Sequence, residues 1–150
     1  IIFDIVAVLR QGWDFTHGFY RLVGRWVGSL QHTGFAHDDI RESAPVKGEA
    51  LLGWGAHVVL GVIYGVGFVF AFGSSAIVTP QLWQGPIFAL ATVLVPWFVF
   101  QPLFGWGFGM SKAPEPWKMR MKGVINHTVF GVGIWLSIKI LNGFFALQWV

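Results

Sequence analysis

The stretch that decides the fold lies at residues 50–72 and reads ALLGWGAHVVLGVIYGVGFVFAF, without a charged side chain. As an α-helix it would be about 34 Å long, enough to cross the roughly 30 Å hydrocarbon core of a bilayer. Similar apolar runs cover residues 86–110 and 123–145, and residues 1–9 are apolar apart from Asp4. We therefore predict an all-α membrane protein with four transmembrane helices. The first of these, at residues 1–9, is too short to span, so we expect it to continue upstream in the natural protein.

The composition agrees with lipid as the solvent. Charged residues make up only 11% of the chain and hydrophobic residues 55%, whereas a soluble domain carries about 25% charged residues. The absence of cysteine from the sequence excludes disulfides and thiolate metal sites. The net charge of +3 is small and its cations flank apolar runs, so we expect no binding to nucleic acid.

The cations are distributed unevenly between the connections. Residues 74–85 carry no charge, whereas the other two connections hold most of the Lys and Arg: Arg10, Arg21, Arg25, Arg41, Lys47, Lys112, Lys118, Arg120 and Lys122. The positive-inside rule places these two connections in the cytoplasm, with both termini outside. Lys139 is the exception, and we expect it to snorkel outward from the last span.

The first basic connection begins with an amphipathic pattern. Apolar residues recur at helical spacing through residues 18–30, and Arg21 and Arg25 lie four apart on the opposite face from Trp26. We predict a short helix lying in the cytoplasmic membrane interface, with a helix that caps the bundle as the alternative. Glu49, which follows this connection, is expected at the membrane surface near Lys47.

Two of the predicted spans share a spacing of Gly and His. The sequence Gly53, His57, Gly61 in the second span is matched by Gly123, His127, Gly131 in the fourth. We interpret the match as a duplicated helical hairpin, with the two hairpins oriented in parallel across the membrane. Chance is the alternative, because glycine is abundant here, with 20 residues.

Glycines spaced by four also predict packing faces. In lipid they let helix backbones approach closely, which favours association through dispersion and weak Cα–H contacts. The residues expected on these faces are Gly53, Gly61, Gly65, Gly123 and Gly131. We expect the faces to point inward or toward a partner.

Polar side chains fall at similar predicted depth in all four spans. They are Asp4, His57, Gln101 and His127. Ionisable residues within a span are costly, so this layer is a candidate site. Three interpretations remain open: internal hydrogen bonds that fix helix register, ligation of haem or (bacterio)chlorophyll by His57 and His127, and a path for protons or substrate.

Other chemistry finds little support in the sequence. His32, His37, Asp38 and Asp39 lie in a polar loop without metal-ligand spacing, so we expect a solvated loop and no metal site. Nucleophilic triads, phosphate-binding loops and paired catalytic carboxylates are not recognisable either. We therefore predict that the protein is not an enzyme.

Several short motifs resemble one known family. They run in the order Val23-Gly24-Arg25-Trp26, His37-Asp38-Asp39-Ile40, Ala44-Pro45-Val46-Lys47-Gly48-Glu49, Gly53-Trp54-Gly55-Ala56-His57, Gln101-Pro102, Gly107-Phe108-Gly109 and Pro114-Glu115-Pro116-Trp117. The chain is similar, from Asp4 to about Leu141, to the bacterial inner-membrane family catalogued as domain of unknown function 2938. The resemblance implies a four-helix protein of the bacterial cytoplasmic membrane and supplies no activity.

The expected function follows from these points. We predict a non-enzymatic accessory or scaffold subunit that works in the lipid bilayer, bound to other membrane subunits or to further copies of itself through its glycine-rich faces. A haem- or chlorophyll-binding protein using His57 and His127 is the first alternative. A small permease or proton-coupled transporter using the same layer is the second.

Overall fold

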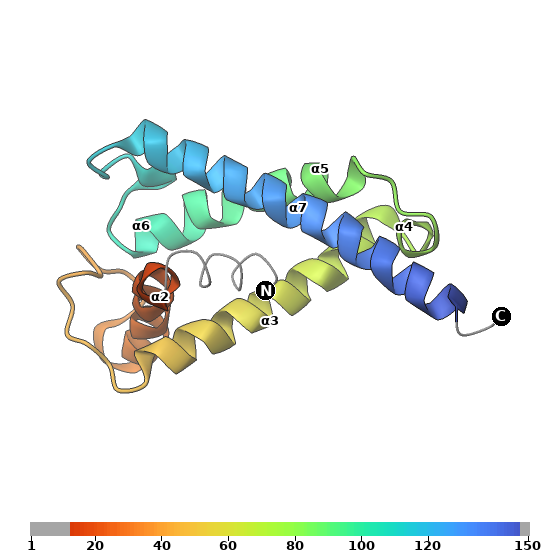
Figure 1. Ribbon diagram of the computed structural model, residues 1–150. Coiled ribbons are helices and arrows are strands. Elements are labelled where there is room, and N and C mark those ends of the chain that lie inside the picture. The colour runs from red at the N-terminus through yellow and green to blue at the C-terminus, as the bar shows by residue number, and fades with distance from the viewer. Residues whose placement is uncertain (1–12, 148–150) are drawn as a thin grey trace.

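The computed structural model describes residues 13–147, which form helices joined by loops (Figure 1). The predicted helix at residues 1–9, with Asp4, lies outside the described residues. The α-helices are α2 (Trp13–Thr33), α3 (Glu49–Phe72), α4 (Ser75–Val78), α5 (Gln84–Thr92), α6 (Gln101–Leu103) and α7 (Pro116–Leu147). A π-helix, η1 (Pro96–Phe100), and a 3-10 helix, η2 (Phe108–Met110), complete them.

Three helical segments are long and apolar enough to cross a membrane: Glu49–Phe72, Gln84–Leu103 and Pro116–Phe145. α3 agrees closely with the predicted helix at 50–72. It lies between two glycines in left-handed backbone, Gly48 with φ 77° and Gly73 with φ 73°, a conformation that other residues rarely adopt. α7 begins earlier than predicted, at Pro116, because proline has no N–H to lose in a first helical turn.

The third span is not the continuous helix predicted at residues 86–110. The α-helix ends at Thr92, a π-helix follows from Pro96, and the last helical residue is Leu103. Pro96 and Pro102 cannot donate backbone hydrogen bonds, which breaks the regular ladder. Beyond them Gly105 and Gly107 have φ of 83° and 71°, so the chain turns out of the helix before the 3-10 turn at η2.

The long helices lie side by side in two pairs. α2 packs mainly on α3, and α5 packs mainly on α7. In Figure 1, α3 and α7 run in the same direction across the view, and the third span returns between them. α2 is seen nearly end-on, so its axis is steeply inclined to the spans.

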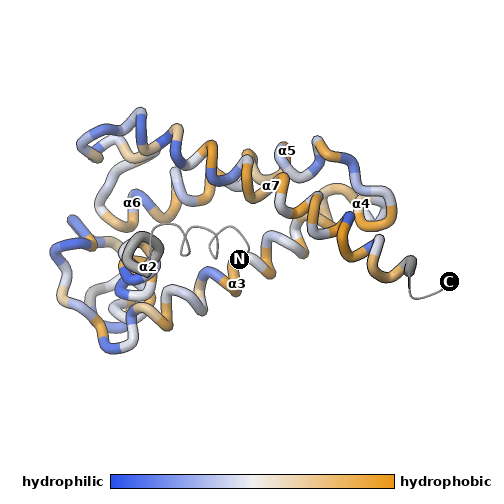
Figure 2. The backbone as a smooth tube through the Cα atoms, in the orientation of Figure 1, coloured by the Kyte–Doolittle hydropathy of each residue, from blue (hydrophilic) through white to orange (hydrophobic). Residues whose placement is uncertain are grey.

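The two ends of the molecule differ in polarity. Figure 2 shows hydrophilic segments gathered at the end that carries α2 and the start of α7, whereas the rest of α3 and α7 has hydrophobic stretches with scattered hydrophilic positions. A small core of Val23, Ile40 and Phe104 lies at this polar end. We call this end the cap, and define it as α2, the loop at residues 34–48 and residues 104–115.

Candidate functional site

The cap is built on a very close approach of two glycines. A Cβ atom on Gly24 would lie 1.7 Å from the carbonyl oxygen of Glu49, and one on Gly53 would lie 1.8 Å from that of Tyr20. Because atoms that are not bonded cannot approach so closely, no larger residue fits at either position without moving α2 away from α3. The approach brings Arg25, the neighbour of Gly24, to the first turn of α3.

Glu49 is the carboxylate at this crossing, and it is 4% exposed. It accepts hydrogen bonds from Arg21 Nε at 3.0 Å, from Arg25 Nε at 2.9 Å and Nη2 at 3.2 Å, and from the backbone N–H of Val46 at 3.2 Å. Its partners are thus the two arginines of α2 and not Lys47. A buried carboxylate needs such charged donors, because it has lost its hydration.

Arg25 also holds the loop that joins α2 to α3. Its Nη1 donates to the carbonyl oxygen of Ser43 at 3.0 Å and lies 3.4 Å from those of Ile40 and Arg41. The guanidinium therefore uses one edge for Glu49 and the other for the loop backbone. Such planar, five-donor geometry suits arginine and is not available to lysine.

The loop in turn binds the end of the third span. The N–H of His37 donates to Leu103 O at 2.9 Å, and that of Ile40 donates to Phe104 O at 3.1 Å. The side chains of Ile40 and Phe104 are fully buried. The first basic connection is therefore packed against the end of the third span, a few residues before the second basic connection begins.

A second charged group covers this junction. Arg41 Nε donates to Asp39 Oδ1 at 2.9 Å, and its guanidinium lies 5.9 Å above the ring of Trp106. The indole N–H of Trp106 donates to Asp39 at 3.4 Å. The hydrogen bonds from Arg41, with a smaller contribution from Trp106, hold the pKa of Asp39 well below its usual range. Asp39 is thus a stable carboxylate in the cap.

His37 ties α2 to the loop through two serines. Its Nδ1 lies 2.9 Å from Ser43 Oγ, and its Nε2 lies 3.3 Å from Ser29 Oγ. The Ser29 hydroxyl donates to Trp26 O at 3.1 Å. His37 therefore joins α2 to the loop through both of its ring nitrogens.

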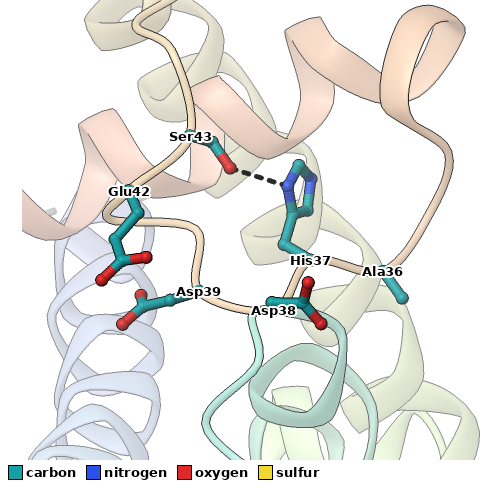
Figure 3. A pocket seen from close by; sticks show the side chains of 6 residues that line it. All are labelled: Ala36, His37, Asp38, Asp39, Glu42 and Ser43. Atoms are coloured by element: carbon teal, nitrogen blue, oxygen red, sulfur yellow. Dashed lines mark hydrogen bonds between the residues drawn. The ribbon is translucent and has the colours of Figure 1, made fainter.

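His37 also borders an open hollow of about 330 Å³. Figure 3 shows its lining side chains, with the carboxylates of Asp39 and Glu42 on one side and that of Asp38 turned away from them. Within residues 13–147, no three His, Asp or Glu side chains come close enough together to hold a metal ion.

The predicted polar layer can be followed at three of its four members, because Asp4 is outside the described residues. His57 Nε2 lies 3.4 Å from the hydroxyl of Tyr20 on α2. His127 Nδ1 donates to Gly123 O on its own helix at 2.9 Å, which leaves Nε2 as the lone-pair nitrogen of the neutral ring. Gln101 is 6% exposed, and its Oε1 has no hydrogen-bond partner in the described part of the chain. These contacts do not join the three side chains, and their common role stays a prediction.

The predicted packing glycines fall into two groups: three lie close to another helical segment, and two have no close neighbour among the described residues. Gly53 lies at the crossing of α2 with α3, and Gly131 crosses α5, where a Cβ would lie 2.5 Å from Gly85 O. Gly123 faces Trp97, whose Nε1 would lie 3.4 Å from an added Cβ. Gly61 and Gly65 have no described heavy atom within 4 Å of an added Cβ.

The partner glycines at both crossings, Gly24 and Gly85, are absent from the sequence prediction. Gly24 lies in a helix whose amphipathic pattern drew attention to its apolar residues instead, and Gly85 was assigned to a turn. A local feature of the sequence could have identified both glycines. Gly24 directly precedes Arg25, and Gly85 directly precedes Pro86 near the start of α5.

The predicted interface residues of α2 have different surroundings. Arg21 is 57% exposed at its side chain and Arg25 only 13%. Trp26 packs its ring edge-on against Phe100 and Phe104, and its N–H donates to Phe35 O at 2.8 Å. Arg25 and Trp26 therefore face the protein, and the position of α2 relative to a membrane stays a prediction.

Comparison with known proteins gives one match. The family described as protein of unknown function (DUF2938) matches residues 1–141, nearly the whole chain. Neither the curated proteins nor the solved structures contain a match. Three of the motifs that suggested this family from the sequence supply the charged residues at the cap and its junction with α3: Arg25, Asp39 and Glu49 each lie in one of them. The chain belongs to the DUF2938 family.

Proposed function

We propose that this chain is a non-enzymatic accessory or scaffold subunit of a larger assembly in the bacterial cytoplasmic membrane. The observation that carries the proposal is how little the spans cover one another. Within the most apolar stretch of α3, as of α7, only 6% of the residues are buried inside the chain. Apolar helix faces in a membrane meet either lipid or other helices.

The middle of α3 offers the best surface for another helix. Val58, Val62 and Val66 are about half exposed there, and Gly61 and Gly65 lie among them. A partner helix could approach the backbone at these glycines, and the branched valines would lose little side-chain entropy on contact. The rigid cap supports this use, because it fixes the start of α3 through Glu49.

Native mass measurement in mild detergent tests the proposal. We expect protein isolated from its own membrane to have a native mass above that of its single denatured chain, through a different subunit or a second copy. Gly61→Ile should weaken that association, whereas Gly143→Ile, another open glycine near the end of α7, should not. A single chain in every mild detergent, for both variants and the parent, would contradict a scaffold role.

The proposal includes a topology. Four spans in two parallel hairpins would place the cap in the cytoplasm, with α2 in the interface and both termini outside. The steep inclination of α2 to the spans supports it, as do the hydrogen bonds between the first basic connection and the end of the third span, from which the second basic connection follows. The cysteine-free sequence allows a direct test with a membrane-impermeant thiol reagent. Ser74→Cys should react in intact cells and Lys112→Cys only after permeabilisation; the opposite pattern would invert the topology.

A small permease is the second candidate function, favoured by the broken third span. Irregular backbone at membrane depth is tolerated where it is buried in protein or lines a cavity, and Gln101 lies directly after the π-helix, with an oxygen that has no hydrogen-bond partner among the described residues. For a permease, Gln101→Leu and His57→Leu should abolish uptake or proton flux in reconstituted vesicles. For an accessory subunit, both variants should assemble normally.

An absorption spectrum separates the pigment alternative from both. His127 donates from Nδ1 to its own helix, which leaves Nε2 to ligate a metal, so a Soret or chlorophyll band should be lost in His127→Leu. A colourless preparation would dismiss this alternative.

A further inference from the structure

The segment at residues 112–122, which we call the basic segment, has an excess of positive charge. It carries Lys112, Lys118, Arg120 and Lys122 against the single carboxylate of Glu115. Lys118 pairs with Glu115 within the segment. Arg120 donates from Nε to the carbonyl oxygen of Gly109 at 2.6 Å, a neutral partner that leaves the guanidinium charge uncompensated. Cations outnumber carboxylates in this segment, which therefore carries net positive charge where the cap meets the start of α7.

The same segment exposes apolar side chains between its cations. Trp117 is 70% exposed, and Met119 and Met121 are both more than one third exposed. All three lie in the first turns of α7, where the last of the candidate spans begins at Pro116. Trp residues favour the boundary between headgroups and acyl chains, and Lys side chains reach from there toward phosphates.

This alternation favours a ligand that is both anionic and apolar. A soluble phosphate would use the cations but leave Trp117 and the methionines in water. An acidic protein segment would meet the same mismatch, because its carboxylates must be surrounded by polar side chains to stay soluble. An anionic phospholipid matches both parts, since its headgroup carries the charge and its acyl chains lie against the apolar side chains.

We propose that the basic segment binds the headgroup of an anionic phospholipid, which would anchor the cap to one leaflet. The site is independent of the scaffold function, because it lies at the start of α7 and not on the exposed middle of α3. The leaflet at the other end of the molecule meets the uncharged connection at residues 74–85, so the two leaflets are distinguished by charge alone.

The lipid that the protein retains in mild detergent tests this inference. The full chain, in mild detergent, should retain phosphatidylglycerol in preference to phosphatidylcholine when its bound lipid is measured by native mass spectrometry. Each lysine near an anionic surface contributes roughly 1 kcal/mol, so the variant Lys112→Gln/Lys118→Gln/Lys122→Gln should lose about tenfold to a hundredfold in this preference. Raising the salt concentration should weaken the preference of the parent protein in the same direction.

Lys139→Gln is the matched control, because it removes one cation from the same helix, Pro116–Leu147, far from its start. It should keep the preference for phosphatidylglycerol. An equal loss in the control, or no preference in the parent protein, would overturn the inference. So would equally strong retention of inorganic phosphate or of a soluble polyglutamate peptide, since neither has acyl chains.

Discussion

The two helix crossings use the same glycine device in different surroundings. At α2 with α3, Gly24 meets Gly53, and the crossing is closed by Glu49 between Arg21 and Arg25. At α5 with α7, a Cβ on Gly85 would lie 2.0 Å from the carbonyl oxygen of Gly131, and neither α5 nor residues 123–138 carry a charged side chain.

The second crossing is stabilised by other means. Phe68 of α3 packs edge-on against Phe88 with ring centroids 5.6 Å apart, and Trp135 and Asn142 of α7 donate to backbone carbonyls before α5. The comparison teaches that close backbone contact can be combined either with ion pairs or with apolar packing and neutral hydrogen bonds. Ion pairs serve where a helix begins beside polar loops, and dispersion with neutral hydrogen bonds serves within the apolar part of the spans.

The largest effect should come from filling either crossing. Gly24→Ala and Gly85→Ala should each destabilise the protein by about 4 kcal/mol or more, because the new methyl group would meet a backbone carbonyl that cannot move alone. Thermal unfolding in mild detergent, followed by circular dichroism, measures the loss. Gly61→Ala, at an open glycine, is the control and should stay within about 0.5 kcal/mol of the parent. Unchanged melting of Gly24→Ala would mean that the backbones do not touch.

Glu49→Gln should separate the two crossings. It removes the charge that compensates Arg25, so the cap should lose roughly 3–5 kcal/mol, as expected for breaking a buried ion pair. The control Glu115→Gln breaks an exposed pair with Lys118 and should cost less than about 1 kcal/mol. Similar small losses in both variants would show that the carboxylate of Glu49 is solvated.

Asp39→Asn should reveal a smaller, pH-dependent part of the cap. The folded-state pKa of Asp39 is lowered, so its pairing with Arg41 stabilises the protein above the unfolded pKa of about 4 and is lost as the pH falls through the folded value. Because Arg41 is 57% exposed, solvent screening should limit the difference to about 1 kcal/mol at neutral pH. The stability gap between parent and variant should close below about pH 4; a constant gap would point to packing instead.

Asn142→Ala should give the smallest change, at the end of the molecule away from the cap. It removes the hydrogen bond from Nδ2 to Ile77 O at 2.6 Å, and such side-chain bonds between membrane helices contribute about 0.6 kcal/mol on average. Glu49→Gln should therefore exceed it severalfold in the same unfolding assay. A comparable loss would remove the distinction between the two ends.

The comparison also indicates what sequence can predict. Composition and the length of the apolar run predict the start of α3 to within one residue. A span can be recognised in this way because lipid requires an uninterrupted apolar stretch of sufficient length. The predicted end of the third span was wrong. The sequence stays apolar past Leu103, but Pro102, Gly105 and Gly107 end the helix there. Apolar patterns do not report backbone breaks made by proline and glycine.

Pairing between helices was beyond the sequence pattern. Arg25 and Glu49 are 24 positions apart, and nothing in their spacing shows that Gly24 lets α2 approach closely enough for them to meet. The matched Gly-x-x-x-His pairs illustrate the same limit. Gly53 forms one crossing, but its counterpart Gly123 faces Trp97, and Gly131 forms the other. Similar local spacing thus leaves the contacts of each helix undetermined.

The π-helix in the third span has a consequence for the direction of its side chains. One additional residue in a helical turn rotates everything that follows by about 100° about the axis. Before the π-helix, Gly85 faces α7; Phe100 at its end and Phe104 after it face Trp26 of α2. The shift in phase allows one helix to serve two neighbours in succession. Removing a single residue from 96–100 would leave the span long enough for the bilayer and turn its aromatic side chains away from the core they complete.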